Sequence, residues 1–280
     1  MISVNQFNII KVTNNLPENI LDNLAVEEPL EIRIVYFYNG NAYNKVVSIT
    51  MCTPGNDEEL AIGFLYTEGI IQSYLQVAKV DVGTSDNHHF VIVTVAKDAQ
   101  LDLSKLERNF YTTSSCGVCG KSSIDAIKSV CPDFGNDKFE IKLAPSIIYS
   151  LPQKLIQKQK VFQSTGGLHA SALFNFDGEL ISLREDVGRH NALDKLIGDA
   201  LKNDMIPLNG SILLLSGRAS FELIQKAYMA GIKVIVAIGA PSSLAVELAM
   251  ESDITLIGFL RQEKFNIYSS NYRVEYKIEK

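Results

Sequence analysis

The stretch from residue 211 to residue 259 alternates apolar runs with helix-like stretches, and this pattern limits the possible folds. Apolar runs occupy 211–215, 233–238 and 254–259, and apolar residues at helical spacing occupy 220–230 and 243–250. Connections this short between successive strands and helices favour neighbouring parallel strands. The sequence therefore predicts an α/β fold whose ligand crevice lies at the carboxyl ends of the parallel strands.

The first part of the chain has a different period and predicts a separate, smaller unit. Residues 31–38 alternate between apolar and polar, Asn39 and Gly40 predict a turn, and 46–51 form the returning strand. We expect Asn56 to cap a following helix, and we expect further strands near 77–82 and 90–95. The predicted division is a polar arm at 1–25, a small α+β domain at 26–108 and an α/β domain at 109–280.

Charge and cysteine usage exclude several classes of protein. A net charge of −6 argues against a nucleic-acid binder, because binding to a phosphate backbone requires clustered lysine and arginine. We find no secretory leader and no apolar run long enough for a membrane span. Four cysteines in 280 residues do not form a disulfide framework. We therefore expect a cytoplasmic protein in which Cys52 and Cys131 are structural.

Cys116 and Cys119 stand three residues apart in a run of small residues, directly before a helix-like stretch. The helix dipole and Lys121 favour the thiolate form there, which is the nucleophilic form of cysteine. The pair fits half of a zinc site, a reversible dithiol, or a sulfur carrier in which one thiolate holds a persulfide. Two buried, inert cysteines are the remaining alternative. The pair indicates thiol chemistry and leaves its kind open.

Two loops rich in small residues follow predicted parallel strands. The first spans 216–220 and contains Ser216 and Arg218, and the second spans 240–243 and contains Ser242. Small residues let backbone N–H groups approach an anion, and Arg218 adds a guanidinium group. The loops favour phosphate binding, and ordinary N-capped loops are the alternative.

Two more polar segments flank another predicted strand pair. His169 follows two glycines into a strand, and a zinc ligand, a proton donor or acceptor near the thiols, and a core histidine are all open roles for it. Residues 184–195 are densely charged and lead into a helix that we expect to end at Gly198. His190 and Asp194 are four residues apart, so Asp194 could orient the imidazole; a charge network joining two elements is the alternative.

The motifs occur together in one order: Cys-Gly-Val-Cys-Gly at 116–120, Thr-Gly-Gly-Leu-His at 165–169, Glu-Asp-Val-Gly-Arg-His-Asn-Ala-Leu-Asp-Lys at 185–195, Ser-Gly-Arg-Ala-Ser at 216–220, Ala-Pro-Ser-Ser-Leu-Ala-Val at 240–246 and Gly-Phe at 258–259. In this combination the chain resembles the FdhD family of formate dehydrogenase accessory sulfurtransferases. The resemblance covers residues from about 25 to 275.

The resemblance implies a cytidine deaminase-like three-layer α/β domain with a smaller N-terminal α+β domain, and a homodimer. It implies a sulfurtransferase that takes persulfide sulfur from a cysteine desulfurase. The sulfur acceptor would be the molybdenum (or tungsten) bis-guanine-dinucleotide cofactor, Mo-bis(molybdopterin guanine dinucleotide), before its use by formate dehydrogenase. The zinc signature of deaminases is absent, so we expect no resident metal. A zinc hydrolase or structural zinc protein that uses Cys116, Cys119 and His169 is the alternative.

The resemblance also assigns roles to residues. Cys116 would carry the persulfide, and Cys119 would be its partner. The family's cofactor-binding stretch maps to Phe259, Leu260, Arg261, Gln262, Glu263 and Lys264. The other expected cofactor contacts are Ser216, Arg218, Ser242, His169, Arg189 and His190.

Overall fold

The computed structural model describes residues 3–85, 88–102, 134 and 141–276, so Cys116, Cys119 and Cys131 lie outside the described residues. The strands are β1 (Val4–Thr13), β2 (Leu16–Ala25), β3 (Glu28–Tyr38), β4 (Asn41–Cys52), β5 (Val77–Ser85), β6 (His88–Val95), β7 (His169–Phe174), β8 (Leu180–Asp186), β9 (Ile212–Leu215), β10 (Val234–Ala237), β11 (Thr255–Arg261) and β12 (Lys264–Ser269). The helices are α1 (Asp57–Thr67), α4 (Pro145–Ile156), α5 (Lys160–Thr165), α6 (Arg189–Lys202), α7 (Phe221–Met229) and α8 (Ser243–Glu251).

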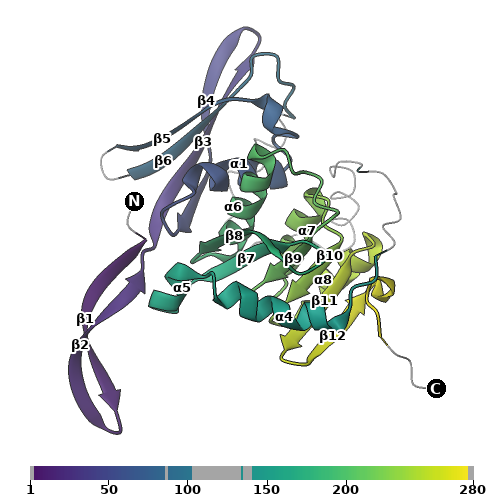
Figure 1. Ribbon diagram of the computed structural model, residues 1–280. Coiled ribbons are helices and arrows are strands. Elements are labelled where there is room, and N and C mark those ends of the chain that lie inside the picture. The colour runs from purple at the N-terminus through teal and green to yellow at the C-terminus, as the bar shows by residue number, and fades with distance from the viewer. Residues whose placement is uncertain (1–2, 86–87, 103–133, 135–140, 277–280) are drawn as a thin grey trace.

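The larger sheet has six strands in the order β12-β11-β10-β9-β7-β8 (Figure 1). Strands β9, β10 and β11 are parallel, which confirms the predicted run. Every residue of β9 and β10 is buried, as their continuous apolar sequences require. Strand β7 is antiparallel to β9, so β7 begins at the same edge where β9 ends.

Helices cover both faces of this sheet. On one face α4 packs Ile148, Leu151 and Leu155 against buried side chains of β7, β9 and β10. On the other face α6, α7 and α8 pack against alternate side chains of the same strands. The domain therefore has helix, sheet and helix layers, as expected for an α/β fold.

The smaller sheet has the order β4-β3-β6-β5, and the predicted β3–β4 hairpin is present. Its apolar face packs on α1, and the same core continues through α1 into α6. Asn56 precedes α1 but does not cap it, which corrects the prediction. Its backbone is left-handed (φ 59°), and its side chain makes no cap hydrogen bond. The carboxylate of Asp57 accepts a hydrogen bond from Gly55 N instead, at 2.9 Å.

Helices α1 and α6 meet at two glycines. A Cβ at Gly63 would lie 1.8 Å from the carbonyl oxygen of Asp194, and a Cβ at Gly198 would lie 1.9 Å from that of Glu59. Gly198 therefore lies within α6 and lets the backbone of α6 touch that of α1, and the helix continues to Lys202. The expectation that Gly198 ends this helix was wrong, because tertiary packing outweighs the low helix propensity of glycine.

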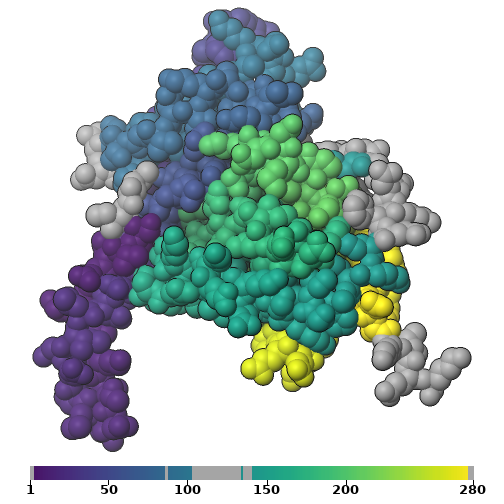
Figure 2. Space-filling model, in the orientation of Figure 1, coloured from purple at the N-terminus to yellow at the C-terminus, as the bar shows by residue number. Residues whose placement is uncertain are grey.

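Residues 4–25, which belong to the segment expected to be a polar arm, form a two-stranded ribbon of β1 and β2. Asn14 and Asn15 both have positive φ, 52° and 64°, as a tight hairpin turn requires. The ribbon projects from the body of the molecule (Figures 1 and 2). Within the described part of the chain, none of the helices is long and apolar enough to cross a membrane.

The glycine contact between α1 and α6 generates a stability prediction. We expect Gly63→Ala to lower the free energy of unfolding by about 3 kcal/mol or more, because the new methyl group meets rigid backbone. Gly210→Ala is the matched control, since a Cβ there meets nothing within 4 Å. Urea unfolding of both variants tests this, and a neutral Gly63→Ala would show that the helices separate easily.

Candidate functional site

The loops that follow β9 and β10 and the end of β11 meet at the carboxyl edge of the large sheet. Gly239 N donates to Gly217 O at 2.9 Å, and Phe259 N donates to Gly239 O at 3.0 Å. Ala219 N donates to Ala240 O at 3.1 Å, which joins the two predicted anion loops. We call these loops, together with His169 and the first turn of α6, the sheet-edge cluster.

The backbone at this edge is packed too closely for larger residues. A Cβ at Gly239 would lie 2.9 Å from Gly217 O, and a Cβ at Gly217 would lie 3.2 Å from His169 Nδ1. The imidazole of His169 therefore lies directly beside the Gly217 backbone. Glycine at 217 keeps space between this ring and the loop.

His169 is half-buried at the first position of β7. Burial lowers its pKa from 6.5, and the positive charges of Arg189 and His190 lower it further, while Asp186 acts in the opposite direction. His169, Arg189 and His190 therefore lie close enough to interact electrostatically, as their assignment to one site requires. A lowered pKa makes His169 neutral at pH 7, so one ring nitrogen accepts a proton.

Arg189 begins α6 and has an unused hydrogen-bond donor. Its Nε is buried and has no hydrogen-bond partner among the described residues. A buried donor without a partner costs free energy that an anionic ligand would recover. The position at the start of a 14-residue helix adds the positive end of the helix dipole.

His190 pairs with a residue that the sequence analysis missed. Its Nε2 lies 2.8 Å from Glu222 Oε2 and 3.3 Å from Ser220 Oγ. The hydrogen bond from His190 lowers the pKa of Glu222. The proposed pairing of His190 with Asp194 was wrong. Glu222 follows the loop at 216–220 by two residues, so its place in the first turn of α7 was the available signal.

Asp194 lies one turn after His190 on the same side of α6, and it pairs with the next turn of α7. Its carboxylate accepts a hydrogen bond from Thr67 Oγ1 at 2.8 Å and pairs with Lys226 Nζ at 3.0 Å. Asp194 is 2% exposed. It therefore ties α6 to α1 and α7, and its spacing of four residues from His190 reflects two successive pairs with α7, His190 with Glu222 and Asp194 with Lys226.

Most of the charged segment at 184–195 joins the two sheets. Lys195 Nζ lies 2.7 Å from Asp186 Oδ2 and donates to Thr53 O at 2.7 Å, with both charged side chains at most 2% exposed. Thr53 N donates back to Asp186 Oδ2 at 3.1 Å, and Asn191 Nδ2 donates to Met51 O at 2.8 Å. The charge-network alternative is confirmed for these residues.

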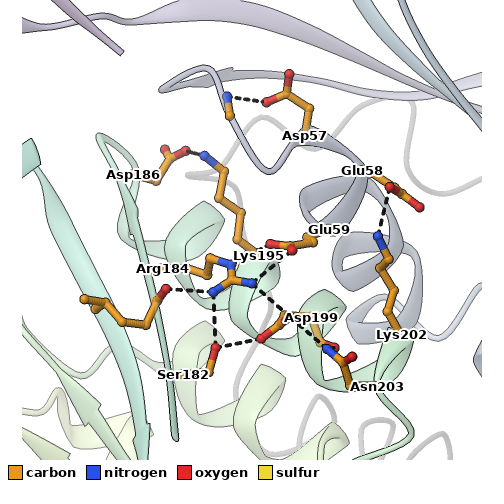
Figure 3. Close-up of polar contacts among 12 residues, drawn as sticks. Asp57, Glu58, Glu59, Ser182, Arg184, Asp186, Lys195, Asp199, Lys202 and Asn203 are labelled. Carbon is orange, nitrogen blue, oxygen red and sulfur yellow. Dashed lines mark hydrogen bonds and ion pairs between the residues drawn. The ribbon is translucent and has the colours of Figure 1, made fainter. Parts of the chain in front are cut away.

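Figure 3 shows further polar contacts of this segment with α1 and α6. We call the contacts that connect residues 184–195 to the small domain the joint. Lys195 reaches Asp186, while Arg184 lies between Glu59 and Asp199. The Arg184 Nη2 atom is 2.9 Å from both Glu59 Oε1 and Asp199 Oδ1. These carboxylates raise the pKa of Arg184 despite its partial burial, so the guanidinium is a permanent link between β8, α1 and α6.

Several predicted contacts have structural roles instead. Ser216 Oγ accepts from Ala170 N at 2.8 Å, which fastens the loop to β7. Ser242 Oγ accepts from Ala245 N at 3.3 Å and caps α8. The side chain of Leu260 is 1% exposed and belongs to the core. Only the backbone of Leu260 is therefore available at the edge.

The remaining predicted residues are exposed at the sheet edge or in the β11–β12 turn. Phe259 is 43% exposed and has φ +53°, a left-handed conformation that turns its ring outward. Arg261 donates to Ile238 O at 2.7 Å and so borders the loop after β10. Arg218, Gln262, Glu263 and Lys264 are also exposed. Phe259 and Arg218 thus offer an aromatic face and a cation beside the glycine loops.

A separate cavity of about 280 Å³ lies beside the joint, between the β4–α1 loop, α5 and β8. The side chains of Arg184 and Lys195 line it, but both are already paired with carboxylates. Glu185 also lines it and accepts hydrogen bonds from Val161 N at 3.2 Å and Phe162 N at 2.9 Å. These groups are satisfied by the fold, so the sheet-edge cluster is the better candidate site.

The predicted thiol site is outside the described residues, so the structure does not place Cys116 or Cys119 relative to this cluster. No group of three His, Cys, Asp or Glu side chains suited to a metal occurs within the described ranges. Cys52, by contrast, is 2% exposed at the end of β4. Burial raises the pKa of its thiol to about 12, and Asp186 adds to this effect. Cys52 is structural, as expected.

Comparison with known proteins gives consistent matches over the whole chain. The sequence model of the FdhD/NarQ family matches residues 25–275. The chain is 48% identical over 272 residues to a Streptomyces avermitilis protein named sulfur carrier protein FdhD, covering 95% of this chain and 94% of that protein. It is 42% identical over 272 residues to a protein of the same name from Sulfolobus acidocaldarius, covering 97% and 99%.

A solved structure shares the fold. It is the crystal structure of a candidate formate dehydrogenase accessory protein from Desulfotalea psychrophila. The TM-score is 0.72 at 22% sequence identity, covering 97% of this chain and 99% of that one. At this identity the likeness concerns the arrangement of the elements.

The buried pair of Lys195 and Asp186 generates a second stability prediction. We expect Lys195→Met to lower the free energy of unfolding by about 3–5 kcal/mol, because the buried carboxylate of Asp186 would lose the opposite charge beside it. Lys202→Met is the control: its pair with Glu58 is partly exposed, and its loss costs about 0–1 kcal/mol. Equal effects in urea unfolding would contradict the structural role of Lys195.

The lowered pKa of His169 predicts a pH dependence of stability. The unfolded chain, with an ordinary pKa of 6.5, takes up a proton where the folded protein keeps His169 neutral. This stabilisation is present above pH 6.5 and is lost as the pH falls toward the folded-state pKa. His169→Gln should therefore lose less unfolding free energy than the wild type on acidification. His88→Gln, at an exposed position, is the control and should follow the wild type.

Proposed function

This chain belongs to the FdhD/NarQ family, and we propose that it is a sulfurtransferase that carries persulfide sulfur on Cys116. Its relatives at 42–48% identity bear the name sulfur carrier protein, which supports a role in sulfur transfer. The observation that carries the rest of the proposal is the unpaired Nε of Arg189 beside glycine-lined loops at one sheet edge. Such an edge suits an anionic sulfur acceptor.

The donor in this proposal is a cysteine desulfurase that holds a cysteine persulfide. The Cys116 thiolate attacks the outer sulfur of that persulfide and forms a new S–S bond. The S–S bond of the donor breaks, and its cysteine leaves as a thiolate that takes up a proton. No external oxidant is needed, because the sulfane sulfur moves between two equivalent thiols.

The second step releases the carried sulfur, and here Cys119 acts as the partner thiol. Its thiolate attacks the Cys116 sulfur and displaces the outer sulfur as sulfide, leaving a disulfide between Cys116 and Cys119. An external dithiol then reduces this disulfide and restores the carrier. The sulfide then replaces an oxygen ligand on the metal of the acceptor, and that oxygen leaves as water.

The acceptor we propose is the molybdenum or tungsten bis-guanine-dinucleotide cofactor, Mo-bis(molybdopterin guanine dinucleotide), as a substrate. Its pyrophosphates match the donors of Arg189 and Arg218 and the backbone of the loops at 216–220 and 240–243. The exposed ring of Phe259 suits stacking against guanine. Glu263 in the β11–β12 turn opposes phosphate, so we assign that turn the smaller share of binding.

The sheet-edge histidines supply proton transfer in this proposal. Glu222 holds His190 at 2.8 Å and keeps its ring oriented toward the loop at 216–220. His169 stays neutral and accepts a proton from a thiol near the bound acceptor. Neither group requires a resident metal.

The wider setting follows from the same resemblance. In this proposal the large domain has a cytidine deaminase-like fold without the zinc chemistry of deaminases. The protein acts in the cytoplasm as a homodimer. Its partners are the desulfurase that loads Cys116 and formate dehydrogenase, whose activity requires the sulfurated cofactor. The six-stranded sheet with helices on both faces is compatible with this assignment.

The carrier role of Cys116 gives the fourth prediction. Incubation with a cysteine desulfurase and cysteine should add one sulfur atom, seen by intact-mass spectrometry, on the peptide that contains Cys116. Cys116→Ala should abolish this label and leave formate dehydrogenase synthesised but inactive. Cys52→Ala is the matched control and should retain the label, since its thiol is buried with a pKa of about 12.

Two results would overturn the carrier proposal. One is full maturation of formate dehydrogenase by Cys116→Ala. The other is stoichiometric zinc, lost together in Cys116→Ala and His169→Ala variants, in protein purified without chelator; this would favour the zinc alternative.

A further inference from the structure

The N-terminal ribbon carries six of the large apolar side chains that are exposed among the described residues: Phe7, Ile10, Val12, Leu16, Leu21 and Leu24. Strands β1 and β2 pair over ten positions, from Val4 opposite Ala25 to Thr13 opposite Leu16. They form a sheet of their own, so both outer edges lack a strand partner within the described part of the chain. An isolated two-stranded hairpin is at best marginally stable in water.

Both faces of the ribbon expose large apolar side chains. Strand alternation places Ile10, Val12 and Leu21 on one face, exposed by 67%, 64% and 62%. The other face carries Phe7 and Leu16, exposed by 51% and 72%. Full burial of one such side chain is worth about 1.5–3 kcal/mol. Covering either face would therefore stabilise the protein considerably.

Among the described residues, the body of the same chain covers only the base of the ribbon. Ser3 Oγ donates to Pro54 O at 3.1 Å, and Val26 N donates to Ser3 O at 3.0 Å. A Cβ at Gly167, before β7, would lie 3.7 Å from the Cβ of Ala25. Beyond this base the ribbon extends away from the body (Figures 1 and 2). The described residues of the body therefore leave the outer part of the ribbon uncovered.

The size of the ribbon favours reciprocal contact. Strands of ten residues are about 33 Å long, and two of them are about 10 Å wide, so one face has an area of about 330 Å². One docked face would bury about 660 Å² on both molecules together, less than the roughly 1,200 Å² that a stable interface needs. Two exchanged ribbons would bury about 1,300 Å², which meets that requirement.

The charges of the ribbon also suit a second copy. Its 22 positions from Val4 to Ala25 contain one lysine, Lys11, and two acids, Glu18 and Asp22. Lys11 stands opposite Glu18 across the two strands. The ribbon is therefore close to neutral, so it has no strong attraction for a charged partner and no strong repulsion from its own kind.

We propose that the ribbon from Val4 to Ala25 is an exchange arm that lies against a second copy of this chain. The exchange is reciprocal, with each copy covering one face of the ribbon of the other, and it produces a closed two-fold dimer. This names the contact surface of the homodimer in the proposed function, and it does not depend on whether Cys116 carries sulfur.

The molar mass in solution tests the exchange arm. The wild-type protein should be a dimer by light scattering coupled to size exclusion. Ile10→Ser combined with Leu21→Ser should raise the dimer dissociation constant by about 100-fold or more, because apolar burial is lost in both copies. The control is Asn8→Ser combined with Asn19→Ser. These asparagines stand directly opposite Leu21 and Ile10 on the same face, and the control should remain a dimer.

A second measurement keeps the test independent of variant folding. Wild-type protein is mixed from ¹⁴N- and ¹⁵N-labelled samples and cross-linked with an amine-reactive reagent. Peptide pairs of mixed isotope that join Lys11 to lysines of the body would support the exchange. Three results would each overturn the exchange. They are a monomeric wild type, a dimer unchanged by Ile10→Ser with Leu21→Ser, and a ribbon that is covered only when a desulfurase is present. The sulfur label on Cys116 is measured separately, so either proposal fails on its own.

Discussion

The backbone contact of α1 and α6 is the constraint from which the arrangement of the site follows. Gly63 and Gly198 allow the two helices to touch without intervening side chains. At this separation Lys195 of α6 reaches both Thr53 O, in the loop before α1, and the carboxylate of Asp186 at the end of β8. These contacts fix the small sheet relative to the large one. They also hold the start of α6 at the edge of the large sheet.

This joint explains why one short segment of sequence serves two purposes. Asp186, Asn191, Asp194 and Lys195 turn inward and are buried among partners from the small domain and α7. In the first turn of the same helix, His190 lies 3.3 Å from Ser220 in the loop after β9, and Arg189 keeps an unpaired Nε. The inward side chains hold the helix start in place, which gives the outward ones a fixed direction. Rigid support of this kind is what positions binding groups accurately.

The sequence predicted the parallel strands, the β3–β4 hairpin and the loops at their carboxyl ends, because these depend on local periodicity and on small residues next to strands. It did not predict the partners of α6. Spacing suggested that Asp194 orients His190, but each of the two side chains has its own partner on α7, Glu222 for His190 and Lys226 for Asp194, and these partners are remote in sequence. Gly198 read as a helix end for the same reason, since its role is a contact with Glu59 that is remote in sequence. The ribbon was missed because Asn14 and Asn15 were not recognised as a hairpin turn.

The central claim is that the inward residues of this segment support the fold while Arg189 binds the anionic acceptor. The most direct test measures the dissociation constant of GDP, a fragment of the proposed acceptor, together with the free energy of unfolding, for Arg189→Gln and Asp194→Asn. We expect Arg189→Gln to weaken GDP binding by about tenfold or more, since a hydrogen bond to a charged group is worth about 1.5–3 kcal/mol. The free energy of unfolding should change little. Asp194→Asn should lower stability while the folded protein binds GDP normally. Unchanged GDP binding in Arg189→Gln, or a binding defect confined to folded Asp194→Asn, would contradict this claim.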